Sequence, residues 1–278
     1  MSLRSEMVRL GLRWLIKRRN HRELSIEQHR QLATAAERLV RDPPAETETL
    51  RVDADGVWAD LITTPASEPN RHVLFLHGGG FIIGSPSLYR HVTWRIAETT
   101  GARVLAVDYR LAPEHPFPAA LEDAVTAYHW LLANGAEPRR IAVMGDSAGG
   151  GLVFSLMLRL RDEGVPLPGA AVALSPWTDL ALTGPSLRLN AAADPMLSAE
   201  DPPQFVEDNS PVPIRAPPTS RRFTAIPLVC RRRSFRSAAT KCSATTRCAW
   251  PFACARQGAR SNSKYGRACR TSGTFSCR

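Results

Sequence analysis

Four short, continuous apolar runs with helical stretches between them constrain the fold of this chain most strongly. The runs are rich in β-branched residues and lie at residues 73–76, 104–107, 141–144 and 170–174. The sequence between them predicts helices at about 87–100, 118–133 and 148–163. Strands that are apolar on both faces and alternate with helices predict an α/β fold with a mostly parallel sheet. Functional loops are then expected at the carboxyl ends of the strands.

The residues before this alternation predict a helical cap and a β-hairpin. Residues 1–20 carry an approximate apolar stripe surrounded by arginines. This pattern suits a cap packed on the main domain, and it also suits a helix at a membrane surface. A second helix is expected over residues 25–40, with Ser25 as the N-cap of a capping box. Asp55-Gly56 predicts the turn of a short hairpin.

A Gly-x-Ser-x-Gly motif at residues 145–149 follows the third apolar run and opens a predicted helix. In this context the motif is typical of a nucleophile elbow, a tight strand-to-helix turn that exposes the serine hydroxyl. Ser147 is therefore the candidate nucleophile. The N-terminus of the following helix favours negative charge that develops beside the serine.

A second motif, His77-Gly78-Gly79-Gly80, follows the first of the parallel strands. Consecutive glycines let the backbone approach a bound group closely and aim several N–H groups at one point. An oxyanion hole needs this geometry. A flexible surface loop is the alternative interpretation, and the nucleophile elbow 70 residues later argues against it. His77 is expected to shape the loop through hydrogen bonds and not to act as the general base.

Taken together, the motifs resemble those of the hormone-sensitive-lipase family of α/β-hydrolase esterases, over about residues 1–200. The segments that carry the resemblance lie at residues 77–81, 108–114, 115–118, 145–150, 175–179 and 194–197. The resemblance implies an α/β-hydrolase fold with Ser147 as the nucleophile. It also implies an oxyanion hole formed by the N–H groups of Gly79, Gly80 and Ala148.

The same resemblance assigns supporting roles to other segments. Residues 1–45 would form helical cap elements over an acyl pocket, and residues 46–200 the hydrolase core. Asp146, which precedes the nucleophile, is expected to be structural. Asp108 and Arg110 are expected to brace the site.

The catalytic base and acid are missing from this pattern. α/β-Hydrolases place an acid and then a histidine after the serine. The last of the seven histidines is His129, so none follows Ser147. Use of His115 or His129 would need an unusual geometry, and no later carboxylate lies in a segment resembling the family's acid loop. No triad acid and no triad histidine are identified, and the core is expected to be truncated at its last two strands.

Composition changes sharply near residue 200. Residues 1–200 carry 21 basic and 23 acidic side chains, whereas residues 201–278 carry 15 and 3, together with all six cysteines. The overall net charge of +10 therefore arises from the tail. This tail is expected to be disordered or poorly packed.

Four interpretations of residues 201–278 compete. A zinc site lacks histidine and Cys-x-x-Cys spacing, and a disulfide scaffold does not suit a cytoplasmic type of core. A basic nucleic-acid arm is the third interpretation. The fourth is translation in a shifted reading frame. Under that hypothesis the codons near residues 239–250 re-read as the family's acid loop, and those near 264–276 re-read as its histidine loop.

The sequence therefore predicts a carboxylic-ester hydrolase that forms an acyl-enzyme and requires no cofactor and no metal. The chain itself is expected to be inactive or nearly so. A non-catalytic ligand-binding protein with a basic tail and an amide or lactone hydrolase are the alternatives. A small acyl ester is the expected partner, with no nucleic acid. The sequence contains no run of 18 apolar residues, so no transmembrane helix is expected. Residues 1–20 allow weak surface association, and a cytoplasmic location is expected.

Overall fold

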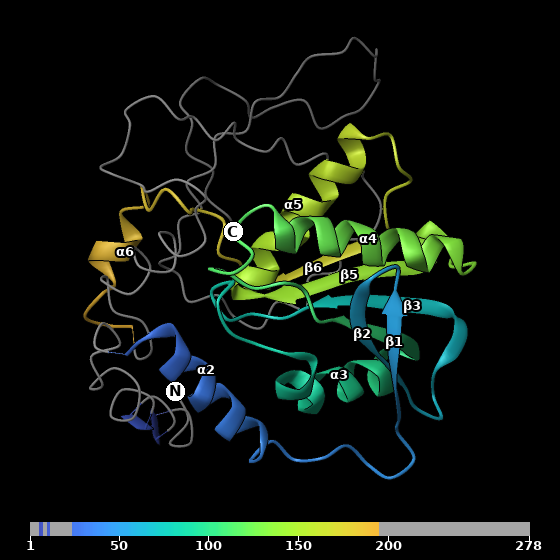
Figure 1. Ribbon diagram of the computed structural model, residues 1–278, viewed down its shortest axis with the longest axis horizontal. Helices are drawn as coiled ribbons and strands as arrows, with labels where there is room; N and C mark the ends of the chain where they lie inside the picture. Colours follow the sequence, from blue (N-terminus) through green and yellow to red (C-terminus); the bar gives the residue numbers. More distant parts are fainter. Residues whose placement is uncertain (1–5, 8–9, 12–23, 195–278) are drawn as a thin grey trace, which may run out of the picture. The chain divides into compact units, whose positions relative to one another are not determined.

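A central six-stranded sheet organises the part of the chain that the computed structural model describes, which comprises residues 6–7, 10–11 and 24–194. These residues lie in one compact unit. Helix α3 covers one face of the sheet, and α4 and α5 cover the other (Figure 1). The strands are β1 (Glu48–Ala54), β2 (Val57–Thr63), β3 (Glu68–Leu76), β4 (Ala102–Val107), β5 (Ile141–Asp146) and β6 (Ala170–Leu174). The helices are α2 (Ile26–Glu37), α3 (Pro86–Thr100), α4 (Ala119–Ala133), η3 (Pro138–Arg140), α5 (Ser147–Asp162) and α6 (Ser186–Leu189).

The strands follow the order β1-β2-β4-β3-β5-β6. Strands β4, β3, β5 and β6 are parallel to one another, and β2 pairs antiparallel with β1 and with β4. The predicted mostly parallel sheet and the hairpin are thus confirmed. At the hairpin turn Asp55 and Gly56 both adopt positive φ angles, 56° and 89°. A two-residue turn needs this conformation to match the twist of its strands.

Two elements differ most in length from the prediction. Strand β3 begins at Glu68, five residues before the apolar run, because its backbone already pairs with Ala102 of β4 while its side chains are exposed. Helix α2 starts with the predicted capping box on Ser25 but ends at Glu37. Beyond that point the guanidinium of Arg90 donates to two carbonyls of the terminal turn, which satisfies acceptors that a longer helix would bond internally.

The core has two halves, one on each side of the sheet. Leu74 and Leu76 of β3 pack into the larger half, with the buried faces of α4 and α5. Val73 and Phe75 point the other way and pack with α3. This alternation along a strand that is buried on both faces explains why its sequence reads as a continuous apolar run.

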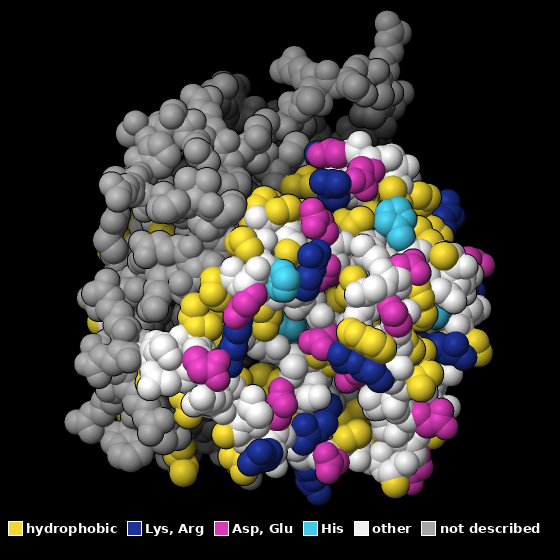
Figure 2. All heavy atoms as spheres, in the orientation of Figure 1, with side chains coloured by type: hydrophobic (Ala, Val, Ile, Leu, Met, Phe, Trp, Pro, Cys, Tyr) yellow, Lys and Arg dark blue, Asp and Glu magenta, His cyan; other side chains and the backbone are white. Residues whose placement is uncertain are grey.

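On the face seen in Figure 2, acidic and basic side chains are interspersed over the described surface. This agrees with the nearly balanced charge of residues 1–200. Residues 6–7 and 10–11 are helical, while the rest of the predicted helix over residues 1–20 lies outside the described residues. Residues 201–278, which are expected to be disordered or poorly packed, also lie outside the described residues, as does most of the segment 194–197. No helix in the described ranges is long and apolar enough to span a bilayer.

Candidate active site

A sharp turn joins β5 to α5 and places Ser147 at the first position of the helix. Its φ angle is 51°, a left-handed conformation that is strained for a residue with a side chain. The turn is tight because glycines flank it. A Cβ atom on Gly145 would lie 2.5 Å from the carbonyl oxygen of Gly149, and one on Gly149 would overlap carbonyl oxygens of Leu76 and His77. The Gly-x-Ser-x-Gly sequence thus permits the strand and helix to meet at Ser147.

The glycine-rich loop after β3, residues 77–80, lies directly against this turn. Gly79 and Gly80 adopt positive φ angles of 124° and 64°, and both are half-buried. The N–H groups of Ile82 and Ile83 donate to the carbonyl of Gly79, at 3.1 and 3.0 Å, and so fix the curvature of the loop. Among the described residues, no hydrogen bond engages the N–H of Gly79 or of Gly80. Both donors are therefore available to a bound group.

Ala148 contributes a donor of a different origin. It follows Ser147 in the first turn of α5, where backbone N–H groups have no partner within the helix. The residue is fully buried, and its helix begins beside the glycine-rich loop. A helix N-terminus stabilises negative charge placed close to it. Such an arrangement can stabilise an oxyanion next to the Ser147 hydroxyl.

Tyr89 links the two motifs, and sequence reasoning missed it. Its hydroxyl accepts the Gly78 N–H at 3.1 Å and donates to Oδ2 of Asp146 at 2.8 Å. A Cβ atom on Gly78 would lie 2.5 Å from that same carboxylate oxygen, so no larger residue fits there. The burial of Tyr89 and the neighbouring Asp146 carboxylate raise the pKa of its hydroxyl. No local motif marks this tyrosine, because its partners are 11 and 57 residues away.

His77 lies beneath the glycine-rich loop and is almost completely buried. Its Nδ1 donates to the carbonyl of Gly78 at 2.8 Å, and its ring stacks on Tyr109 with 4.1 Å between the centroids. The Tyr109 hydroxyl donates to the His77 carbonyl at 2.7 Å. Burial lowers the pKa of His77 to about 4, so the imidazole is neutral at pH 7.

Asp146 points toward Tyr89 and Gly78. Burial raises the pKa of its carboxyl, and the hydrogen bond from Tyr89 opposes that shift. Its Oδ1 is buried and has no hydrogen-bond partner among the described residues. The contacts of Asp146 are therefore those of a residue that ties the elbow to the loop.

Two further residues expected to brace the site hold ion pairs. Arg110 binds Asp123 through its side chain and its backbone N–H, at 2.8–3.1 Å. Asp108 pairs with Arg51 of β1. These contacts hold the segment after β4, which carries the Asp-Tyr-Arg sequence, against α4 and the hairpin.

The described carboxylates after Ser147 have other partners nearby. Asp162 and Glu163 pair with arginines at the end of α5. Asp179 accepts the Gly184 N–H at 2.8 Å and the Thr183 hydroxyl at 3.2 Å, and so closes its own loop. Within residues 24–194, no group of three or more His, Cys, Asp or Glu side chains could hold a metal ion.

Comparisons of sequence and structure with known proteins agree with this fold. A family model described as the alpha/beta hydrolase fold matches residues 73–230, more than half of the chain. The chain belongs to this alpha/beta hydrolase family. Solved relatives include an esterase from the bacterial hormone-sensitive-lipase family, 38% identical, with a TM-score of 0.70. That match covers 77% of this chain and 72% of the relative.

Curated relatives of this alpha/beta hydrolase carry esterase and acetyl-hydrolase names. An acetyl-hydrolase of Streptomyces hygroscopicus is 48% identical over 49% of this chain and 46% of its own length. An esterase of Acinetobacter venetianus is 36% identical, covering 58% and 52%. The putative acetyl-hydrolase LipR of Mycobacterium tuberculosis is 34% identical, covering 76% and 69%. The chain thus spans about half to two thirds of the length of these relatives, and it is a member of a hydrolase family.

Proposed function

We propose that this chain has the architecture of a carboxylic-ester hydrolase that works through an acyl-enzyme on Ser147. The observation that carries the proposal is the strained Ser147 backbone beside a loop with two uncommitted N–H donors. The serine oxygen would attack the carbonyl carbon of a small acyl ester. The N–H groups of Gly79, Gly80 and Ala148 would stabilise the resulting oxyanion. The alcohol would then leave, and water would release the acid from the serine.

We further propose that this chain turns over esters very slowly or not at all. Its sequence has no histidine after His129, so the base that should accept the Ser147 proton is absent from its usual place in the chain order. Loss of triad members lowers kcat by about 10⁴–10⁶-fold in serine hydrolases, while oxyanion stabilisation and binding leave a small residual rate.

The first prediction concerns turnover of p-nitrophenyl acetate and butyrate. The purified chain should release p-nitrophenol no faster than its Ser147→Ala variant, because no base activates the hydroxyl. Stopped-flow absorbance at pH 7–9 measures both rates. A clear rate that Ser147→Ala abolishes would contradict the proposed inactivity, while supporting Ser147 as the nucleophile.

A non-catalytic binding protein is the second candidate, favoured by the absence of histidine behind the serine. Reading the gene across codons 199–211 separates the two. A shifted frame identifies a damaged esterase, whereas an intact frame matched by a peptide from the tail favours a binding protein. Amide or lactone hydrolysis would use the same serine and the same donors. We also propose that residues 1–45 form a cap, that residues 46–200 form the hydrolase core and that residues 201–278 form a separate tail. The proposed location is cytoplasmic.

A further inference from the structure

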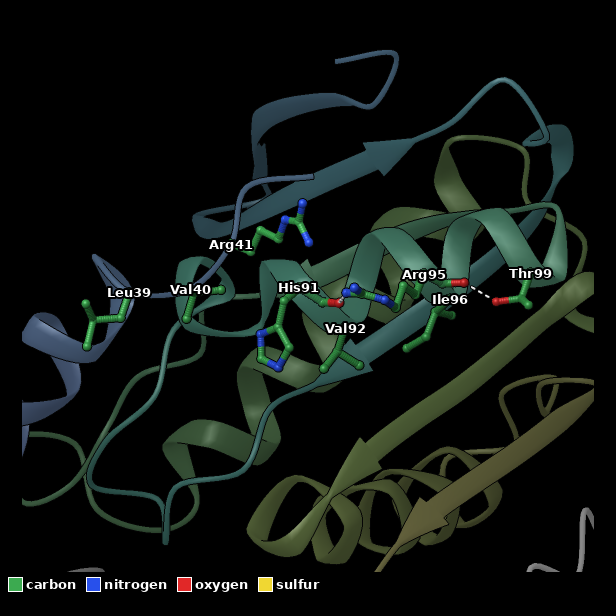
Figure 3. A pocket seen from close by; sticks show the side chains of 8 residues that line it. All are labelled: Leu39, Val40, Arg41, His91, Val92, Arg95, Ile96 and Thr99. Carbon is green, nitrogen blue, oxygen red and sulfur yellow. Dashed lines mark hydrogen bonds between the residues drawn. The ribbon is translucent and has the colours of Figure 1, made fainter. Parts of the chain in front are cut away.

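A surface groove of about 570 Å³ lies between the segment after α2 and the outer side of α3 (Figure 3). None of the residues that line it belongs to the nucleophile elbow or to the glycine-rich loop. Val40, Val92 and Ile96 give the groove apolar, half-buried surfaces. The side chain of Leu39 lies at its end and is 88% exposed.

The two rows of α3 side chains along the groove differ in character. Val92 and Ile96 are one helical turn apart and form an apolar row. His91 and Arg95, also one turn apart, form a basic row beside it. Arg41 supplies a second guanidinium from the opposite wall (Figure 3). The groove therefore combines an apolar strip with a basic rim, and no carboxylate lines it.

The walls of the groove are held together by Arg90 of α3. Its guanidinium donates to the carbonyl of Glu37 at 2.8 Å and to that of Val40, and it pairs with the Asp42 carboxylate at 3.1 Å. The Ser85 hydroxyl also binds the Glu37 carboxylate. Because these bonds fix the segment after α2 to α3, the groove is formed without a ligand.

The basic rim has uncommitted donors. Among the described residues, no hydrogen bond and no ion pair engages the Arg41 side chain, whereas nearby Arg90 binds three acceptors on the same segment. Arg95 lies over the ring of Trp94, at 4.4 Å from its centroid, and donates through Nη1 to the His91 carbonyl. A guanidinium with free donors beside an apolar strip suits a carboxylate head group attached to an alkyl chain.

We propose that this groove binds a free, single-chain fatty carboxylate. The alkyl chain would lie along Val92 and Ile96, with the carboxylate between Arg41 and Arg95. The volume lies within the range of small-molecule sites. The part of α3 that lines the groove, from Val92 to Thr99, is about 10 Å long, which suits a chain of medium length. This site is independent of the proposed ester hydrolysis, because it does not involve Ser147.

Isothermal titration of the full chain with octanoate, decanoate and dodecanoate, below their micelle concentrations, tests the proposal. We expect saturable 1:1 binding that tightens about two- to fourfold per methylene group from octanoate to decanoate and no further with dodecanoate, whose chain is longer than the groove. Arg41→Glu should weaken decanoate binding about tenfold, since it replaces an attractive charge with a repulsive one. Arg38→Glu, the same charge change on an exposed residue outside the groove, should alter it less than twofold. Ser147→Ala should bind decanoate like the parent chain.

Several outcomes would overturn the proposal. Equal losses in Arg41→Glu and Arg38→Glu would indicate diffuse charge attraction, and decanol binding as tightly as decanoate would remove the role of the guanidinium groups. Binding to anionic phospholipid vesicles without binding to free decanoate would identify a lipid surface instead. Circular dichroism of each variant separates a lost site from a lost fold. If Arg41→Glu does not fold, Arg95→Gln replaces it, with Arg38→Gln as its control, and a smaller loss of about threefold is expected because a charge is removed and not reversed.

Discussion

At the scale of single residues, the site depends on glycines that leave no free space. Gly78 faces the Asp146 carboxylate, and Gly149 faces two carbonyl oxygens of the chain that leads into the glycine-rich loop. Because backbone atoms cannot move aside as a flexible side chain can, a methyl group at Gly149 must displace the helix or the strand. The motifs alone predicted Ser147, the turn around it and the glycine-rich loop. They contained nothing about Tyr89, whose role depends on contacts made only in the folded chain.

Gly149→Ala should therefore destabilise the protein by about 2–3 kcal/mol through overpacking. Gly184→Ala is the matched control. A Cβ atom there would lie 3.4 Å from a carboxylate oxygen of Asp179, an ordinary contact, so little change is expected. Urea unfolding followed by circular dichroism measures both midpoints. Equal midpoints for the two variants would show that the elbow has more space than the structure indicates.

The buried imidazole of His77 gives a pH prediction. Its pKa in the folded chain is lowered to about 4, while an unfolded chain keeps the ordinary 6.5. The unfolded state therefore binds the proton first, and the stability contribution present above pH 6.5 is lost as pH falls toward 4. Between pH 8 and pH 5 this amounts to about 2 kcal/mol. Proton NMR should show a neutral His77 ring at pH 5 in the folded chain. In urea at the same pH the ring should be charged, and this spectrum serves as the reference.

At the scale of elements, Arg30 fastens helix α2 to the site. Its guanidinium donates to the carbonyls of Ile82 and Ala112, at 2.9 and 2.8 Å, and binds both carboxylate oxygens of Glu114 at 2.7 Å. Ile82 follows the glycine-rich loop, so the helix and the loop share one anchor. The helix itself was predictable from Ser25 and its capping box, but its attachment was not, because the partners lie more than 50 residues away.

The Glu114 carboxylate makes this attachment sensitive to acid. The hydrogen bond from Arg30 lowers the pKa of Glu114 to about 2. The contribution to stability is present above the unfolded value near 4.5 and is lost as pH falls from there to about 2. It should stay below about 1 kcal/mol, because Glu114 is half exposed and water screens the pair.

Glu114→Gln should therefore flatten the decline in Tm between pH 5 and pH 2, and it should speed proteolytic cleavage just after α2. Glu98→Gln, on the exposed side of α3, serves as the control. An identical Tm profile for the parent and Glu114→Gln would mean that the Arg30 contact with the two carbonyls suffices to hold the helix.

At the scale of the whole molecule, β6 marks the outer limit of the described sheet. It pairs with β5 on one side, and among residues 24–194 no strand pairs with its other side. Leu174 at its end is 47% exposed. An unpaired apolar edge invites association with other chains. The alternation of apolar runs and helices predicted this sheet well because the runs at residues 73–76 and 104–107, in its centre, are buried on both faces. Near residue 200 the pattern disappears, and with it any prediction of the remaining fold.

Leu174→Lys should raise the soluble, monomeric fraction severalfold, because a charge on an edge strand opposes strand-to-strand association. Leu50→Lys, on the opposite edge strand β1 and also exposed, tests whether the effect is specific. Gel filtration with light scattering measures the mass. Equal improvement from both variants would assign the effect to net charge, and a monomeric parent chain would remove the premise.

The order of the strands also determines how long a strand lacks its partners while the chain is being synthesised. Strand β3 ends at residue 76, but its two neighbours arrive later, β4 by residue 107 and β5 only by residue 146. At about 5–20 residues per second, synthesis needs roughly 4–14 s to cover those 70 residues. Throughout that interval the buried apolar half of β3, residues 73–76, lacks a partner on at least one side. The ribosome-bound chain is therefore most vulnerable to aggregation before Ser147 has emerged, and chaperone dependence should concentrate in that interval.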